Sequence, residues 1–235
     1  MTFTKSCMVH KTPRARRRDA NGARILDAAM ELIAQGGLEA LSMARLAEAV
    51  DYTAGALYRY FPSKDALLAH LVAQVLEEVQ GFLARAEAAL PSGAFPLTRV
   101  FALAQGYREF AKERPHGFSL LALTMADPRV LLPQHADAAP VTQRVISTLE
   151  LLAQALGDAE SSGQLAPGDV TERTLHLFAT LQGLLLLHKQ ARLAPSVLDL
   201  ERLVPSAVRT LLIGWGAKAR AADAALEKAQ PGGHP

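Results

Sequence analysis

The sequence predicts an all-α fold, with a small helix-turn-helix unit near the N-terminus and a larger helical domain after it. Half of the 235 residues are apolar, which is enough to bury a sizeable core. Ala and Leu are abundant, whereas aromatic residues make up only 6% of the chain; straight-chain residues lose little rotamer freedom in a helix. Apolar residues also recur at the three- and four-residue spacing of helices along most of the chain.

The composition argues against several kinds of protein. The single cysteine, Cys7, excludes an intramolecular disulfide and a multi-cysteine metal site. The N-terminus lacks the apolar segment of a secretory signal peptide, and the most apolar stretch, residues 175–187, is too short to span a bilayer. His176 and His188 are too far apart along one helix to chelate a single metal ion. We therefore expect a soluble cytoplasmic protein with no membrane partner, no metal and no cofactor.

Residues 1–18 form a basic segment with no acidic residue. Such a run often marks a tail that is attracted to nucleic acid. The alternative is a solvated, disordered tail with no partner. Either way, we expect residues 1–18 to be a disordered arm. Its basic residues are Lys5, Lys11, Arg14, Arg16, Arg17 and Arg18.

Three helices are expected after the arm. The first covers residues 19–34 and ends at Gly36 and Gly37, which readily take the left-handed conformation that ends helices. Ser42 can cap a second helix that stops near residue 51, and Thr53 can cap a very short third helix through residue 60.

A long fourth helix begins after Ser63, which can cap it, and Asp65 suits its first turn. The Pro- and Gly-containing stretch at residues 91–96 is the expected end of this helix and of the first structural unit. Further helices are predicted at 97–113, 115–126, 140–156, 170–192 and 197–215, followed by a frayed helix and a tail.

Residues 41–61 have the spacing of a helix-turn-helix. Ala47 is small where the two helices must cross closely. The N-terminal residues of the second helix of this motif enter the major groove of DNA. The candidates for contact with base edges are therefore Thr53, Ala54, Gly55, Ala56 and Arg59. The alternative is two packed helices of an ordinary helical domain; Tyr58 and Tyr60, among small residues beside Arg59 and Lys64, favour DNA binding.

This region resembles the TetR (tetracycline-repressor) family over about residues 20–70. The matching positions are Arg24-Ile25-Leu26, Ala28-Ala29, Gly36-Gly37-Leu38, Leu46-Ala47, Leu57-Tyr58, Tyr60-Phe61, Ser63-Lys64 and Leu67. The resemblance implies a transcriptional regulator, most simply a repressor, that binds a palindromic operator as a homodimer and is released by a small hydrophobic molecule. It implies a DNA-binding domain at 19–66, a ligand-binding and dimerisation domain at 67–217, and a tail at 218–235.

The resemblance also assigns contacts by position. It makes Tyr58 and Lys64 phosphate contacts and places Ser42 and Met43 near the DNA backbone; Arg45 and Tyr60 complete the predicted set. Two positions depart from the family pattern. Asp51 stands where the family has a turn glycine, although Asp tolerates the left-handed conformation better than most residues. Met43 occupies a place that is often held by a phosphate-binding Thr or Ser, and its thioether side chain has no hydroxyl to offer a phosphate.

The C-terminal helices offer a dimer interface and a ligand cavity. Leu181, Leu184, Leu185 and Leu187 make the 170–192 helix apolar almost all round, and Gly183 permits close approach. With the stripe at 200, 204, 208, 211 and 215, it can form a four-helix interface, or an ordinary core. The predicted cavity residues mix bulky apolar groups with isolated polar ones, and the alternative is again a filled core. They are Phe101, Gln105, Phe118, Met125, His176, Phe178 and Gln182.

No catalytic motif is expected. Residues 214–219 formally fit a dinucleotide fingerprint, but they end a helix with no strand before it. The competing functions are a helical enzyme and a ligand-independent helical interaction protein. Salt-sensitive affinity for a palindrome is expected of the regulator alone.

Overall fold

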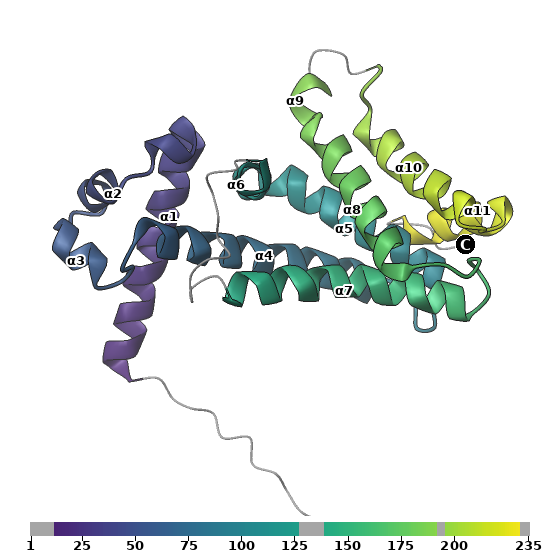
Figure 1. Ribbon diagram of the computed structural model, residues 1–235, viewed down its shortest axis with the longest axis horizontal. Coiled ribbons are helices and arrows are strands. Elements are labelled where there is room, and N and C mark those ends of the chain that lie inside the picture. The colour runs from purple at the N-terminus through teal and green to yellow at the C-terminus, as the bar shows by residue number, and fades with distance from the viewer. Residues whose placement is uncertain (1–11, 127–138, 192–195, 231–235) are drawn as a thin grey trace, which may run out of the picture. The chain divides into compact units, whose positions relative to one another are not determined.

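The computed structural model describes residues 12–126, 139–191 and 196–230, and within these ranges the chain forms helices and no strand (Figure 1). The all-α prediction is therefore confirmed. The chain divides into two compact units, one up to Leu71 and one from Val72 onward. The division lies within a helix, and the predicted end of the first unit at residues 91–96 is wrong.

The first unit contains α1 (Pro13–Ala40), α2 (Met43–Ala49), α3 (Ala54–Tyr58) and the start of α4 (Lys64–Ala88). Gly36 and Gly37 break the helical geometry within α1, and Gly37 has a φ of 68°. The predicted helix end at these glycines is thus confirmed. Their non-helical conformations separate a last short turn, through Ala40, from the body of the helix.

The predicted disordered arm is wrong for residues 13–18, which are the first turns of α1. Pro13 is the first helical residue, where its missing N–H has no partner to lose. Arginine is a good helix former, so the basic run extends the helix beyond the expected start at residue 19. Residues 1–11, the rest of the predicted arm, lie outside the described residues.

Serine and threonine caps set the helix starts in the first unit. The Ser42 hydroxyl accepts the N–H of Arg45, and the Thr53 hydroxyl accepts the N–H of Ala56, both at 3.2 Å. The Ser63 hydroxyl accepts the N–H of Ala66 at 2.9 Å at the start of α4. These three predicted caps are confirmed. The shared core is made of fully buried side chains: Ile25, Ala29, Leu46, Leu57, Leu67 and Leu71.

The turn between α2 and α3 depends on Asp51, which has a φ of 57°. Asp51 donates its N–H to the carbonyl of Glu48 at 3.2 Å, and Tyr52 donates to that of Ala47 at 2.8 Å. A non-glycine residue therefore takes the left-handed conformation at the position where a turn glycine was expected. Asp is one of the few residue types for which this strain is small.

The second unit is built around α5 (Pro96–Glu113), which packs against α6 (Pro115–Ala126), α7 (Ala139–Ser161), α8 (Val170–Leu186), α10 (Leu200–Gly214) and α11 (Ala219–Ala229). A further short helix, α9 (His188–Ala191), follows α8. Phe101 and Phe110 of α5 are almost fully buried because neighbours surround this helix. At Gly106, a Cβ atom would lie only 3.1 Å from both the Cβ of Ala86 and the carbonyl oxygen of Phe82. Glycine therefore allows α5 to approach the end of α4 closely.

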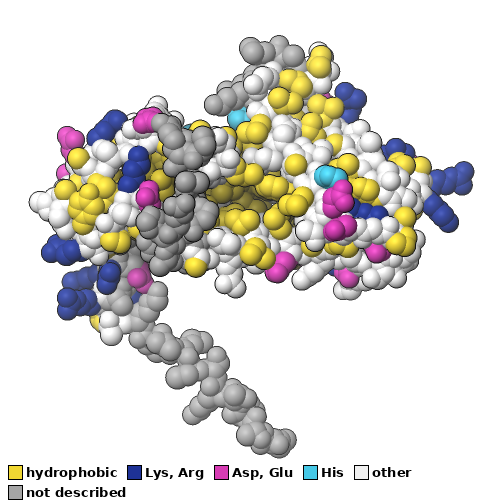
Figure 2. Space-filling view, in the orientation of Figure 1, with side chains coloured by type: hydrophobic (Ala, Val, Ile, Leu, Met, Phe, Trp, Pro, Cys, Tyr) yellow, Lys and Arg dark blue, Asp and Glu magenta, His cyan; other side chains and the backbone are white. Residues whose placement is uncertain are grey.

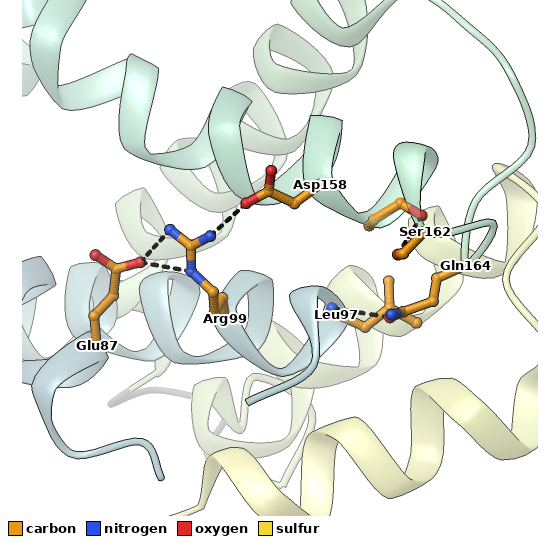
Figure 3. A network of polar contacts seen from close by, with 7 residues as sticks. Glu87, Leu97, Arg99, Asp158, Ser162 and Gln164 are labelled. Carbon is orange, nitrogen blue, oxygen red and sulfur yellow. Dashed lines mark hydrogen bonds and ion pairs between the residues drawn. The ribbon is translucent and has the colours of Figure 1, made fainter. Parts of the chain in front are cut away.

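Polar bonds fix the ends of α4, α5 and α7 to one another (Figure 3). The guanidinium of Arg99 on α5 donates from Nε and Nη2 to Glu87 Oε1 at 3.0 and 2.9 Å, and from Nη1 to Asp158 Oδ2 at 2.6 Å. Nearby, the backbone N–H of Leu97 donates to Gln164 Oε1 at 3.3 Å.

Several predicted boundaries in the second unit need correction. The helix predicted at 170–192 ends at Leu186 and is followed by α9, while the one predicted at 140–156 continues to Ser161. The last predicted helix begins at Leu200 and not at 197, because the Asp199 carboxylate accepts the N–H groups of Glu201 and Arg202. The predicted tail from residue 218 contains α11, which is ordered because Ala222, Ala225 and Ala229 are buried.

One described helix, α4, is long and apolar enough to cross a membrane by length and composition alone. The most apolar window of α4 has a mean hydropathy of 1.2, and 61% of that window is buried inside the protein. This burial is what the core helix of a folded domain also shows. This helix is not the segment at residues 175–187 that the sequence singled out as the most apolar stretch.

Candidate DNA-binding surface and ligand cavity

The start of α3 presents a surface of small side chains. Thr53, Ala54 and Gly55 are exposed and Ala56 is half-buried. A Cβ atom built on Gly55 would meet nothing within 4 Å. The backbone of α3 is therefore unobstructed on this side, which is the geometry that a helix needs in order to approach the edges of bases.

Aromatic and basic residues follow this small surface. Tyr58 is 48% exposed and Arg59 is exposed. Tyr60 is half-buried: its hydroxyl accepts a hydrogen bond from Asn21 Nδ2 at 3.2 Å, and its ring stacks on Tyr52 with centroids 6.1 Å apart. Tyr58 and Arg59 are thus more accessible to DNA than Tyr60, whose side chain also bonds α1.

The three predicted DNA contacts at the start of α2 differ in how exposed they are. Arg45 is exposed, and Ser42 is half-buried with its hydroxyl oxygen engaged as the cap of α2. Met43 is only 8% exposed and belongs to the core. Its burial removes its side chain from the surface that was predicted to lie near the DNA backbone.

Lys64 is held at the start of α4. Its ammonium group donates to the carbonyl oxygen of Leu38 at 3.3 Å, and the residue is half-buried. Leu38 follows the glycine break in α1, so this bond ties that turn to α4. An ammonium group has three donors, and the Leu38 carbonyl uses one of them.

The second unit contains an apolar cavity of about 380 Å³ between α4, α5, α6, α7 and α8. Hydrophobic side chains surround a hollow in the space-filling view (Figure 2). Its size lies within the range of small-molecule pockets, about 300 to 1,000 Å³. The lining residues include Leu76 and Val79 of α4, Tyr107 of α5, and Ile146 and Leu149 of α7.

The predicted ligand-binding residues lie in different places. Met125 and Phe178 line this cavity. Phe101 and Phe118 are each 1% exposed and fill the core, as the alternative interpretation held. Gln105 lines a second cavity of about 590 Å³, near α11.

The two predicted polar anchors on α8 also differ in environment. His176 is exposed on α8, 3.8 Å from Glu172 Oε1, and the cavity lining does not include it. Gln182 is 7% exposed, and its Oε1 accepts the hydroxyl of Tyr107 at 2.5 Å. Burial raises the pKa of Tyr107 above its ordinary value, because the charged form loses its hydration. The aromatic rings of Phe110, Phe118 and Phe178 lie around it.

The contributions of α4 and α7 to the cavity were not predicted from the sequence. Val141, Val145 and Leu149 line it at four-residue spacing, and Val145 and Ile146 are exposed apolar residues, 39% and 51%. The spacing was a signal that could have been used. By itself, however, it does not distinguish a cavity wall from an ordinary buried stripe.

Four of the predicted dimer residues on α8 and α10 belong to the core. Leu181 and Leu185 are each 3% exposed, and Val204 and Val208 are fully buried within the chain. Leu184 and Leu211 are half-buried. A different face of α8 is exposed and apolar. It consists of Leu175, Ala179, Gly183 and Leu186, and we call it the α8 face.

Metal-ligating clusters and the formal dinucleotide fingerprint give no site. Within the described ranges, no group of three or more His, Cys, Asp or Glu side chains could hold a metal ion. The fingerprint segment is the end of α10 and its following turn, where Gly216 has a φ of 99° and the Trp215 carbonyl accepts the N–H of Ala166 at 2.9 Å.

Comparison with known proteins agrees with this two-part arrangement. A family model described as "Bacterial regulatory proteins, tetR family" matches residues 25–71, and one described as "Tetracyclin repressor-like, C-terminal domain" matches residues 100–211. The chain is 30% identical over 193 residues to the HTH-type transcriptional repressor KstR of Mycobacterium tuberculosis (strain ATCC 25618 / H37Rv), covering 81% of this chain and 80% of that protein.

Two further similarities are informative. KstR of Rhodococcus jostii (strain RHA1) is 34% identical over 145 residues, which cover 61% of this chain and 63% of that protein, slightly less than two thirds of its length. The crystal structure of the transcriptional regulator FadR from Bacillus subtilis in complex with stearoyl-CoA superposes with a TM-score of 0.64 at 21% identity, covering 82% of this chain and 98% of that one.

Proposed function

Because the chain belongs to the TetR family of bacterial regulatory proteins, we propose that it is a transcriptional repressor that binds a palindromic operator as a dimer and releases it when an apolar molecule occupies the cavity of the second unit. The observation that carries the proposal is the open surface of α3. Its exposed small residues and unobstructed Gly55 suit insertion into the major groove. The proposal includes no catalytic activity and places the protein in the cytoplasm.

Within this proposal, Arg59 reads bases and Tyr58 and Lys64 hold the DNA backbone. Arg59 follows directly on α3 and has the bidentate donors that recognise guanine. Tyr58 is exposed beside it, and Lys64 has three donors, one of which bonds the Leu38 carbonyl. The Leu38 carbonyl holds the ammonium group in position before DNA arrives, so less side-chain entropy is lost on binding.

The cavity supports a ligand-responsive regulator. Its walls come from α4, which continues into the first unit, and from α5 to α8. The FadR structure of similar fold holds a ligand with a long acyl chain, and an apolar cavity of this size in the present chain suits a hydrophobic molecule as well. Such a ligand can release DNA only if its affinity differs between the DNA-bound and free conformations.

Selection of bound duplexes from a random pool tests the proposal directly. We expect the selected sequences to converge on a palindrome, and the affinity for it to fall steeply as salt rises. A pool that remains random after selection, or an affinity that salt does not change, would contradict DNA binding as the function.

Two variants separate base reading from backbone contact. Arg59→Ala is expected to relax sequence preference, whereas Lys64→Ala should lower the salt slope by about one unit and leave the preference intact. Arg220→Ala, an exposed arginine on α11, is the matched control. An equal loss of affinity on all sequences with Arg59→Ala would contradict its role in base reading.

A further inference from the structure

Among the residues that the structure describes, no charged side chain lines the cavity of about 380 Å³. Its polar lining consists of four hydroxyl groups, on Tyr107, Thr124, Thr142 and Thr148. Arg144, which lies next to the lining on α7, pairs with Glu77 Oε2 at 3.3 Å. An ionised carboxylate inside this cavity would lose its hydration with no cation to compensate it.

The hydroxyl hydrogens of this lining are largely committed to other groups. Thr124 donates to the carbonyl of Leu121 at 2.9 Å, and Thr148 donates to that of Arg144 at 2.7 Å. Tyr107 donates to Gln182 Oε1 at 2.5 Å. Thr142 lies at the exposed start of α7. The inner wall of the cavity therefore offers oxygen acceptors but few hydrogen-bond donors.

One donor behind this wall is free. Gln182 is only 7% exposed, and its amide nitrogen is buried. This nitrogen has no hydrogen-bond partner among the described residues. A buried amide that lacks a partner destabilises a protein, because its hydration is lost and nothing replaces it. Gln182 follows Phe178 by one turn of α8, and the rings of Phe178 and Tyr107 both line the cavity. The Gln182 side chain is therefore one hydrogen bond away from the lining, through the Tyr107 hydroxyl.

From these contacts we infer the chemical class of the ligand: a neutral, largely apolar molecule with one hydrogen-bond-accepting oxygen, which accepts from the Gln182 amide. An ionised organic acid should bind more weakly, because the described lining offers its carboxylate no cation. This inference rests on the proposed function, because it concerns the same cavity. It adds to that function a residue that determines specificity, and it predicts which compounds bind.

Three probes of similar size test the inference with the full-length protein: butylbenzene, butyrophenone and 4-phenylbutyrate. They present a hydrocarbon, a neutral carbonyl and a carboxylate. We expect calorimetric titration at about pH 8 to detect butylbenzene and butyrophenone and to find 4-phenylbutyrate bound at least about 100-fold more weakly than the ketone, since burial of an unpaired charge is unfavourable by several kcal/mol. Binding of 4-phenylbutyrate as tight as that of the ketone, or binding of none of the three, would overturn the inference.

The role of Gln182 is tested by the ratio of two affinities. In Gln182→Leu, the affinity for butyrophenone relative to butylbenzene should fall about tenfold, the effect of one hydrogen bond of about 1.4 kcal/mol. The double variant Tyr107→Phe/Gln182→Leu removes both partners of the buried bond, so it leaves no unsatisfied group and keeps the fold. The same fall is expected in it. Gln154→Leu, the same change at an exposed position of α7, is the control.

An unchanged ratio in both the single and the double variant would show that Gln182 is structural and overturn its assignment. Release of the selected operator is measured separately with each probe that binds. Probes that bind with the expected selectivity but leave the operator bound would contradict the proposed function and leave the ligand class standing.

Discussion

At the scale of single residues, the space around Gly168 is closed by a buried arginine. A Cβ atom on Gly168 would overlap the Nη2 and Cζ atoms of Arg173. Arg173 is 8% exposed, pairs with Glu160 Oε2 at 3.1 Å, and lies 5.8 Å from the ring centroid of Trp215. If the guanidinium moved away from this position, it would lose its ion pair with Glu160 and its contact with the Trp215 ring.

Gly168→Ala is therefore expected to lower the free energy of unfolding by about 1–3 kcal/mol, because the new methyl group displaces Arg173 from its part-buried hydrogen bond with Glu160. Urea denaturation measures the change. Gly157→Ala is the control: a Cβ there meets nothing within 4 Å, and the residue lies within α7. It should be neutral or stabilising by up to about 1 kcal/mol. Equal effects of the two substitutions would rule out the clash with Arg173.

Tyr107 gives a pH dependence at the same scale. Burial raises its pKa above the ordinary value of about 10. The unfolded chain then loses the phenol proton at a lower pH than the folded protein, so the contribution of Tyr107 to stability is complete below about pH 10 and is lost as the pH rises further. The free energy of unfolding of the wild type should fall more steeply above about pH 10 than that of Tyr107→Phe. Parallel slopes in urea titrations would contradict this effect of burial.

At the scale of helices, the first turns of α1 place three arginines on one face. Arg14, Arg17 and Arg18 are exposed and are spaced by three and four residues. A helix fixes their spacing, whereas a disordered arm would not. They are therefore positioned to meet phosphates together.

Replacing Arg14, Arg17 and Arg18 with Ala is expected to weaken operator binding and to reduce the salt slope by up to about three units, about 0.9 for each phosphate that is no longer neutralised. Fluorescence anisotropy over a salt series measures the slope. Alanine keeps the helix, so circular dichroism should not change. A slope equal to that of the wild type would show that these arginines do not contact phosphates and that the segment is a solvated helix end.

Helix ends could be predicted from the sequence where they depend on residues a few positions away. They could not be predicted where they depend on packing against distant parts of the chain. Ser42, Thr53 and Ser63 act through backbone groups three residues away, so their caps could be predicted. The order of α11 could not, because it depends on three alanines that meet a surface far away in sequence. The cavity was missed for a similar reason: α4 and α7 carry apolar stripes like those of any buried helix, and only packing decides whether space remains between them.

At the scale of the molecule, the α8 face remains apolar and exposed. Leu175 and Leu186 are 51% and 46% exposed, with the small residues Ala179 and Gly183 between them. A Cβ atom on Gly183 would meet nothing within 4 Å. Large residues around small ones allow a second helix to approach closely, which suits a twofold interface between identical subunits.

Leu175→Asp combined with Leu186→Asp is therefore expected to produce monomers that no longer bind a full operator. In a dimer, the new carboxylates of each subunit would be buried against the α8 face of its partner. Light scattering measures the mass. Leu123→Asp, at a 38% exposed leucine of α6, is the control. A doubly substituted protein that stays dimeric would place the interface elsewhere.

The Arg99 bonds have a mechanical consequence for the cavity. They clamp α4 and α7 at Glu87 and Asp158, whereas the cavity lies between the opposite halves of these helices, from residues 72 and 141 onward. Near the cavity, α4 and α7 are joined by weaker ties, a Gln80–Ser147 bond at 2.8 Å and the Arg144–Glu77 ion pair.

The two helices thus resemble a pair of levers fastened at one end. Residues 72 and 87 are about 22 Å apart at about 1.5 Å per residue, so a rotation of about 5° about the clamp moves residue 72 by about 2 Å. The same helix continues to Lys64 in the first unit. A molecule that widens the cavity therefore displaces α4 more near residue 72 than at Glu87, where the Arg99 bonds hold it.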